Sequence, residues 1–330
     1  MDSLDLQVLQ TARAWRTEGR AVWLVTVIET WGSSPRPPGA LLALRDDGLV
    51  VGSVSGGCVE DDLIERVRTG ERVAAPSLIL YGVSKEDAAR FGLPCGGTLR
   101  LVQEPVTDAG WIDEVLERTG RHELVARLLD IDSGVLTLAA ARRGEAFSFD
   151  GRTMRSVYGP RWRVLVIGAG QLSRVFAEIA KSVDFEVTCC DPREEYNLTW
   201  DVPNTRFTKS MPDDAIAEMR LDPHCAVVAV THDPKLDDLA LIEALKSPAF
   251  YVGALGSRNN TSKRRERMRM FDLSEAEIAR LHGPIGLDIG SKTPAEIAVS
   301  IVAEMVAVRN GVALKQKKPV PAGESASATA

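Results

Sequence analysis

The sequence predicts an α/β protein in which a mixed α/β module precedes a Rossmann-like domain with a doubly wound parallel sheet. Beyond residue 160, short apolar runs alternate with helical patterns, which is typical of a parallel sheet covered by helices. The run Val164–Ile167 leads into a glycine turn and then into a helical pattern. Nearer the start, strand-like runs flank a hairpin-type turn at Asp46–Gly48, which indicates a different kind of sheet.

Length and composition exclude several classes of protein. The chain has 330 residues, enough for about two domains, and its 45% hydrophobic and 26% charged residues are ordinary for a soluble globular protein. The net charge of −6 argues against a nucleic-acid partner, and no apolar run is long enough for a membrane span. Five cysteines and the lack of a signal-peptide pattern predict a reduced, cytoplasmic protein.

The first module is expected to span residues 1–105. Apolar residues at helical spacing predict a helix over Leu4–Trp15, and β-branched and aromatic residues predict a strand over Ala21–Thr30. The proline- and glycine-rich stretch at 32–39 cannot be regular structure. Further along we expect a helix over Val59–Arg68 and strands over Ser77–Tyr81 and Thr98–Gln103.

Residues 106–160 are interpreted as an extension of the first module and a connection. They contain a helical pattern at Trp111–Arg118 and strand-like runs at Glu123–Leu129 and Val135–Ala140. The Rossmann-like domain follows at 161–310, and residues 311–330 form a tail that we expect to be disordered. The strands expected in the second domain are Val164–Ile167, Glu186–Cys190, Thr205–Thr208, Ala226–Val230 and Phe250–Val252.

The glycine turn of the second domain matches the pattern of a dinucleotide-binding loop. Gly168 and Gly170 allow a tight turn and a close approach of phosphate to the backbone, and Ser173 takes the third glycine position. Asp191 ends the second strand, 23 residues after Gly168, and its carboxylate is placed to bind ribose hydroxyls. The same carboxylate would disfavour a 2′-phosphate, although the nearby Arg193 weakens that preference. NAD or another nucleotide is therefore a candidate ligand of this domain.

Polar residues follow the later strands, where ligands of such sheets bind. Candidates are His232 and Asp233 after the fourth strand, and Gly256, Ser257 and Arg258 after the fifth. Arg258 is the better phosphate ligand because it lies in the glycine turn, whereas His232 is equally well explained as a loop or helix-capping residue.

Two other polar segments are explained structurally. The run Lys263–Arg267 is interpreted as a solvated helix face. Thr293 and Glu296 form a capping box at the start of a helix that ends near Arg309.

Two cysteines lie in glycine-rich loops, unlike the usual buried cysteine. Cys58 follows Ser55-Gly56-Gly57 at a helix start, where free N–H groups favour a thiolate, and Cys95 precedes Gly96 and Gly97. We expect a functional role for at least one of them. A structural zinc site is not expected because no paired ligand spacing exists. Cys189, Cys190 and Cys225 are assigned to the core.

These motifs together resemble the XdhC/CoxI family. The resemblance rests on GSSPRPPGA (32–40), GSVSGGCVE (52–60) and GLPCGG (92–97) in the first module. In the second it rests on VIGAG (166–170), CDPREEY (190–196), THD (231–233), GALGSR (253–258) and GLDIGSKTPAEIAVSI (286–301). Gln171 departs from the family, since many relatives carry histidine there, and residues 106–160 contain no motif that aligns.

The resemblance implies an accessory protein for molybdenum hydroxylases such as xanthine dehydrogenase. Such proteins bind the molybdenum cofactor (molybdopterin), protect it while a cysteine desulfurase provides sulfur, and insert it into the apo-enzyme. A maturation chaperone, expected to be a homodimer, is thus favoured over a catalyst. Cys58 and Cys95 become candidate ligands of molybdenum or sulfur, and Arg36 a ligand of the cofactor phosphate. The backbone of the neighbouring glycine-rich segments becomes a candidate binding site for the cofactor, which gives Ser55, Gly56, Gly57, Gly96 and Gly97. The cleft between the modules is the expected location.

Two other functions remain open from the residues alone. A nicotinamide-dependent oxidoreductase is supported by the Gly168 loop and Asp191, but the sequence offers no acid–base group beyond His232 and Asp233. A scaffold that uses the Rossmann-like domain only for dimerisation is the third possibility.

Overall fold

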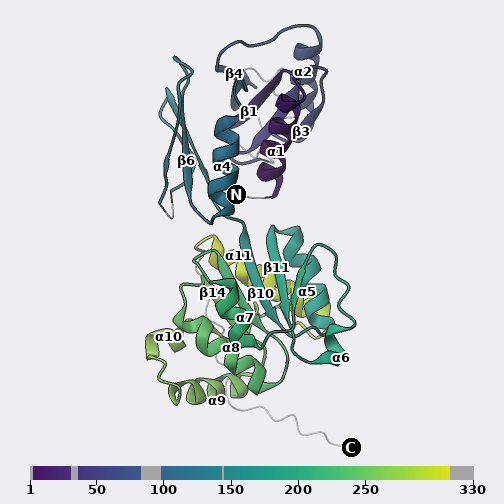
Figure 1. Cartoon of the computed structure of the whole chain (residues 1–330), viewed down its shortest axis with the longest axis vertical. Helices are drawn as coiled ribbons and strands as arrows, with labels where there is room; N and C mark the ends of the chain where they lie inside the picture. Colours follow the sequence, from purple (N-terminus) through teal and green to yellow (C-terminus); the bar gives the residue numbers. More distant parts are fainter. Residues whose placement is uncertain (1–2, 31–35, 83–97, 143–144, 313–330) are drawn as a thin grey trace, which may run out of the picture. The chain divides into compact units, whose positions relative to one another are not determined.

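A computed structural model describes residues 3–30, 36–82, 98–142 and 145–312. The chain divides into two compact units, Met1–Arg161 and Trp162–Ala330 (Figure 1). The predicted tail beyond residue 312 lies outside the described residues, as do Gly32 to Pro35 and the loop that contains Cys95, Gly96 and Gly97. Each unit has its own hydrophobic core and is treated separately.

The first unit is built on a five-stranded antiparallel sheet with the strand order β3-β2-β1-β5-β4. Its strands are β1 (Val22–Thr30), β2 (Leu41–Arg45), β3 (Val50–Gly52), β4 (Ser77–Tyr81) and β5 (Leu99–Pro105). Helix α2 (Cys58–Arg68) covers one face, and α1 (Ser3–Thr17) packs on the other. Successive side chains of β1 point to opposite faces of the sheet, so both faces carry apolar residues that a helix can cover. Trp23 and Val25 belong to the core under α2, and Leu24 belongs to the core under α1.

A second, four-stranded antiparallel sheet completes this unit, with the order β7-β6-β9-β8. Its strands are β6 (Val125–Asp130), β7 (Leu136–Ala140), β8 (Ser148–Phe149) and β9 (Thr153–Tyr158), and α4 (Gly110–Gly120) precedes them. The predicted helix and both predicted strand-like runs are confirmed. The sequence pattern does not predict strand β9, although Met154, Ser156 and Tyr158 alternate as buried residues along it.

The second unit contains a six-stranded, fully parallel sheet in the order β12-β11-β10-β13-β14-β15. The strands are β10 (Trp162–Ile167), β11 (Phe185–Cys190), β12 (Arg206–Thr208), β13 (Cys225–Ala229), β14 (Tyr251–Ala254) and β15 (Leu281–His282). In sequence terms this is the 3-2-1-4-5-6 order of a Rossmann fold, and the predicted fold class is confirmed.

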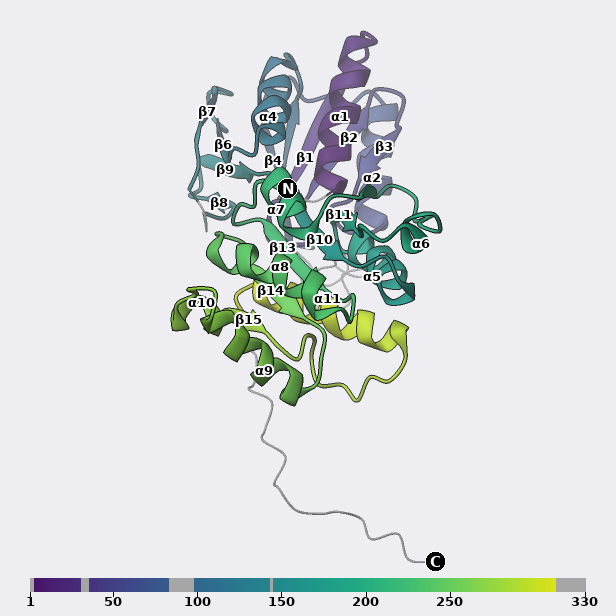
Figure 2. The same ribbon diagram turned by 60° about the horizontal axis from the view of Figure 1, so that its bottom comes forward.

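Helices cover both faces of the parallel sheet. Helices α5 (Gln171–Ser182) and α11 (Pro294–Arg309) pack on one face, and α7 (Pro212–Met219) and α8 (Pro234–Lys246) pack on the other. Three further helices, α6 (Glu194–Asn197), α9 (Arg258–Arg269) and α10 (Glu275–Ala279), complete the unit, with α9 and α10 beside the β14–β15 end of the sheet (Figure 2). The capping box of Thr293 and Glu296 is confirmed at the start of α11.

Candidate functional site

The loops that follow β10, β11, β13 and β14 lie at one edge of the parallel sheet, since all four strands run in the same direction. The chain order reverses between β10 and β13, because β11 lies on one side of β10 and β13 on the other. Rossmann folds bind their ligands at this switch point. The structure therefore brings the predicted residues of the second unit to a single edge.

The glycine turn after β10 leaves a helix N-terminus open. Gly168 has a φ of +106°, and a Cβ there would lie 3.1 Å from the Cα of Thr231, so only glycine fits. Gly170 is the N-cap of α5 in an extended conformation, and a Cβ there would meet no described atom within 4 Å. Gln171 is the exposed first residue of α5. The unpaired N–H groups of this helix turn are thus accessible to an anion.

Asp191 is engaged by the protein itself. Its carboxylate has no exposed surface, and it accepts hydrogen bonds from Ala169 N at 2.8 Å and from Arg193 Nε at 2.9 Å. Burial would raise the pKa of Asp191, but the bonds from Arg193 and Ala169 outweigh it and hold the pKa below its ordinary value. In this arrangement Asp191 braces the glycine turn, and binding of ribose hydroxyls would require Arg193 to move.

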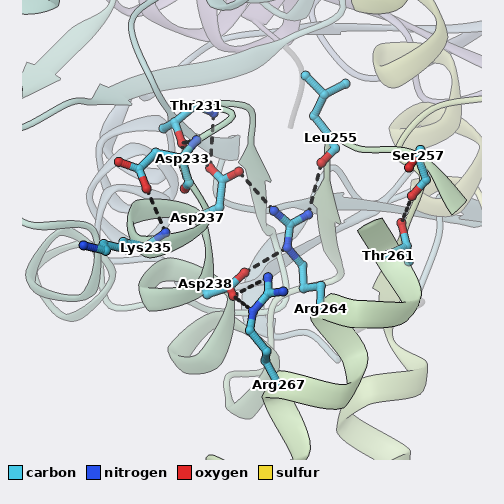
Figure 3. A network of polar contacts seen from close by, with 10 residues as sticks. All are labelled: Thr231, Asp233, Lys235, Asp237, Asp238, Leu255, Ser257, Thr261, Arg264 and Arg267. Carbon is cyan, nitrogen blue, oxygen red and sulfur yellow. Dashed lines mark hydrogen bonds and ion pairs between the residues drawn. The ribbon is translucent and has the colours of Figure 1, made fainter. Parts of the chain in front are cut away.

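A network of polar contacts connects helices α8 and α9 to the loops after β13 and β14 (Figure 3). Asp237 on α8 is fully buried and accepts hydrogen bonds from Thr231 N at 3.1 Å and Thr231 Oγ1 at 2.8 Å. Arg264 on α9 donates to Leu255 O at 3.1 Å, to Asp237 Oδ2 at 3.2 Å and to Asp238 Oδ1 at 2.9 Å. One guanidinium therefore fixes two loops and one helix of the candidate site.

This network corrects one interpretation of the sequence. The pattern of Lys263–Arg267 predicts a solvated helix face, but the Arg264 side chain is only 7% exposed and pairs with both aspartates. Arg267 is half-exposed and contacts Asp238 at 2.7 Å. On the basic face of α9, Arg264 is therefore a buried ion-pair residue, whereas Arg267 forms an ion pair at the surface.

Two of the other predicted residues at this edge, Asp233 and Ser257, have structural partners. Asp233 is the N-cap of α8 and accepts a hydrogen bond from Lys235 N, while His232 precedes it with a φ of +66°. Ser257 is the N-cap of α9, next to Gly256, and accepts from Asn260 N at 3.2 Å. Arg258 is the exposed first residue of α9. Capping explains Asp233 and Ser257, and a ligand role for this set stays a prediction.

In the first unit, the loop before Cys58 wraps around a carboxylate. Glu60 accepts hydrogen bonds from Val54 N at 2.8 Å, Ser55 N at 2.9 Å, Gly56 N at 3.0 Å and Gly57 N at 2.9 Å. The hydroxyls of Ser53 and Ser55 also donate to it. Successive N–H groups of this kind form an anion-binding nest, and here the protein supplies its own anion.

This arrangement changes the expectation for the Ser55–Gly57 segment. The glycine-rich pattern predicts that its N–H groups bind a cofactor, but Glu60 accepts hydrogen bonds from all three. Cys58, the first residue of α2, is an exposed free thiol one residue beyond the nest. Glu60 is the third residue of α2, from which its carboxylate accepts a hydrogen bond from the N–H of the N-cap Gly57, and this spacing is the sequence signal that could have identified its role. Because glycine has no side chain, only this half of a capping box is formed.

Replacing Glu60 with glutamine should destabilise the first unit. Burial would raise the pKa of Glu60, but hydrogen bonds from Ser55 and its neighbours lower it to about 2. Because the folded-state pKa is depressed, the carboxylate stabilises the fold above about pH 4.5, and this stability is lost as pH falls towards about 2. We expect Glu60→Gln to cost roughly 2–3 kcal/mol at neutral pH.

Urea unfolding at neutral and acidic pH checks this expectation. The wild type should lose stability in the acid range, whereas Glu60→Gln should lose less because the titrating group is gone. Glu65→Gln, an exposed glutamate on the same helix, is the matched control and should resemble the wild type. Equal unfolding midpoints for the two variants would show that the nest contributes nothing.

The remaining predicted residues of the first unit are Arg36 and three residues that are not described. Arg36 is half-buried and lines a cavity of about 200 Å³ with Asp5, Phe147 and Tyr158. Its phosphate contact stays a prediction. Cys95, Gly96 and Gly97 lie outside the described residues.

Two negative findings apply to the described part of the chain. Its His, Cys, Asp and Glu side chains form no cluster of three that could hold a metal ion. None of its helices combines the length and apolar character that crossing a membrane requires.

Comparison with known proteins covers both units. A family model described as XdhC Rossmann domain matches residues 164–305, and one described as XdhC and CoxI family matches residues 15–82. A Bacillus subtilis protein that is named as a probable xanthine dehydrogenase component is 27% identical over 88% of this chain and 94% of its own length. The molybdenum cofactor insertion chaperone PaoD of Escherichia coli is 25% identical over 88% and 84%.

The fold has also been observed in a solved structure. A crystal structure of a xanthine dehydrogenase from Bacillus halodurans superposes with a TM-score of 0.76, covering 96% of this chain and 97% of that one at 23% identity. Both family models, which together match more than half of the sequence in the expected order, agree with the motifs in the two units. The chain belongs to the XdhC and CoxI family.

Proposed function

We propose that this protein is an accessory factor that binds the molybdenum cofactor and delivers it to a molybdenum hydroxylase such as a xanthine dehydrogenase. The observation that carries the proposal is the open N-terminus of α5 at Gly170, located at the switch point of a Rossmann sheet. Similarity to a cofactor insertion chaperone along most of both chains supports it. The cofactor is the cargo of this protein rather than a catalytic group.

The chemistry of the cargo fits the residues available. Its phosphate is matched by the N–H groups that begin α5, in a turn that Asp191 holds through Ala169 N and that lies close to Thr231. Its molybdenum prefers a soft ligand, and the exposed thiol of Cys58 is such a group. We propose that Cys58 and Cys95 ligate molybdenum or carry sulfur, that the cofactor is protected during sulfuration by a cysteine desulfurase, and that the protein acts as a cytoplasmic homodimer.

Native purification followed by identification of the bound ligand tests the proposal. Protein from cells grown with molybdate should contain molybdenum and a pterin, and protein from molybdate-free cells should lack the metal. A nicotinamide nucleotide in place of the pterin would instead support the oxidoreductase hypothesis. The Rossmann strand order favours a nucleotide, but the ion pair of Asp191 with Arg193 opposes binding of its ribose.

Replacing Gly170 with valine should remove ligand binding without unfolding the protein. The extended backbone of Gly170 accepts a β-branched residue, and the new side chain occupies open space over the helix N-terminus. Loss of the glycine N-cap should cost no more than about 1 kcal/mol. The measurement is the amount of cofactor retained after purification, together with thermal unfolding.

Gly168→Ala is the contrasting variant for this experiment. Its positive φ and the nearby backbone of Thr231 make any side chain strained, so this variant should lose stability as well as ligand. Undiminished cofactor retention in Gly170→Val, with normal unfolding, would show that the loop does not hold the cargo.

A further inference from the structure

We propose that the first unit contains a second binding site, a carboxylate-lined cavity that takes an arginine side chain presented by a partner protein. The cavity has a volume of about 610 Å³ and lies among α4, strands β6 and β7, the end of β5 and the segment at 74–76. It uses none of the residues assigned to cofactor binding, so it goes beyond the proposed function. Its volume is in the range of specific ligand sites.

The charge of the lining selects a cation. Glu104, Asp108 and Glu114 line the cavity, and no Lys, Arg or His is among its lining residues in the described part of the chain. Arg118 contacts Glu114 at 3.3 Å but does not line the cavity. Arg127 and Arg118 offset the charges of Glu104 and Glu114, whereas Asp108 forms no ion pair with another described residue. The lining thus keeps a negative charge that would attract a positively charged side chain.

Glu104 provides the independent sign of an absent partner. It is 4% exposed and pairs through Oε2 with Arg127, while its Oε1 is buried and has no hydrogen-bond partner among the described residues. The Nε of Arg127 is also buried without a partner, so this ion pair leaves one acceptor and one donor unsatisfied. A buried carboxylate oxygen without a donor is costly, so native proteins rarely leave one. A guanidinium entering the cavity would bring donors to the carboxylate group that lines it.

Trp111 favours arginine over lysine as the entering side chain. Its ring lines the cavity and already has the guanidinium of Arg127 at 4.1 Å from the ring centroid. Aromatic rings and carboxylates together suit the planar, forked guanidinium better than a compact ammonium group. The apolar part of the lining, from Leu129, Leu136 and Leu138, matches the methylene stem of such a side chain.

Exposed apolar side chains close in sequence to the lining residues indicate a protein partner rather than a small cation. Leu78 on edge strand β4 is 47% exposed, and it lies opposite Val102, whose side chain packs towards the second sheet. Val135, in the β6–β7 turn, is 58% exposed, and its neighbour Gly134 lies against Pro76. Exposed apolar side chains near the lining of a charged pocket suit a segment that carries arginine between apolar residues.

Titration with two short peptides tests the site. Acetyl-Leu-Arg-Leu-amide is the probe, and the same peptide with citrulline in place of arginine is the control, because citrulline keeps the shape and loses the charge. Calorimetry should show that the arginine peptide binds at least about tenfold more tightly, and that added salt weakens it. Binding should quench the fluorescence of Trp111, identified by comparison with Trp111→Phe.

Matched variants on α4 locate the binding. Glu114 and Glu117 each pair with an arginine one turn later, but only Glu114 lines the cavity. Glu114→Gln should weaken the arginine peptide about threefold, and Glu117→Gln should leave it unchanged. Glu104→Gln should weaken it about tenfold or more if the variant folds, and the α4 pair decides the matter if it does not.

Several results would overturn the proposal. These are no binding of the arginine peptide up to about 10 mM, equal affinity for the citrulline peptide, or equal effects of Glu114→Gln and Glu117→Gln. Cofactor retention, measured on the same preparations, should be unaffected by Glu114→Gln. Failure of the arginine site is therefore distinguishable from failure of the cofactor-binding proposal.

Discussion

Serine at both Cys58 and Cys95 should abolish activation of a co-expressed xanthine dehydrogenase while the accessory protein still folds. A thiolate can ligate molybdenum or carry sulfur, and a serine hydroxyl does neither well at neutral pH. The exposed position of Cys58 means that the near-isosteric change should cost little stability. The measurement is client activity per molybdenum bound, and at least one of the two single variants should fail.

The other cysteines provide the controls for this experiment. Burial raises the pKa of Cys190 to about 12 and that of Cys225 to about 11, so both thiols stay protonated at neutral pH. Burial also raises the pKa of Cys189. Serine at any of these positions should affect only stability. Full client activity from the double Cys58/Cys95 variant would exclude a thiolate role.

The sequence is most informative where periodicity and turn chemistry agree. An apolar run, a glycine turn and a helical pattern follow one another at β10 and α5, and each of the three signals supports the same strand–turn–helix prediction. The structure confirms the strand and the helix. The strand period alone places Cys189 and Cys190 on opposite faces, and they belong to separate cores on the two faces of the sheet. Strand β9 escapes prediction because its buried face includes the polar Ser156 and its other face includes Val157, so apolar and polar residues do not alternate along it.

The site is less predictable because the sequence pattern does not show which groups its polar side chains pair with. Asp191 has the right position for a ribose ligand, but a residue two places later holds it, which spacing alone could not decide. The sequence pattern assigns no role to Glu60, whereas in the structure its carboxylate accepts hydrogen bonds from the loop before Cys58. Nothing in the basic run of α9 distinguishes Arg264, since its partners lie 26 and 27 residues away on α8.

Arg264→Ala should be among the most destabilising single changes in the second unit. It would leave Asp237, which has no exposed surface, without its guanidinium partner. Removing one member of a buried ion pair typically costs about 3–5 kcal/mol, because the other charge stays buried and unpaired. The loops at Thr231 and Leu255 would also lose their common anchor, so the candidate site should be perturbed along with stability.

The pH dependence and a matched variant separate this effect from a general loss of packing. Burial, partly offset by Thr231, raises the pKa of Asp237, and for an acid with a raised folded-state pKa the stability falls as pH rises through that pKa. The deficit of Arg264→Ala should therefore shrink at acidic pH, and adding Asp237→Asn should recover part of it. Arg267→Ala, which removes only the half-exposed contact with Asp238, should cost less than about 1 kcal/mol. Equal urea midpoints for Arg264→Ala and Arg267→Ala would contradict the assignment of Arg264 as the buried anchor, since an exposed pair and a buried one would then contribute alike.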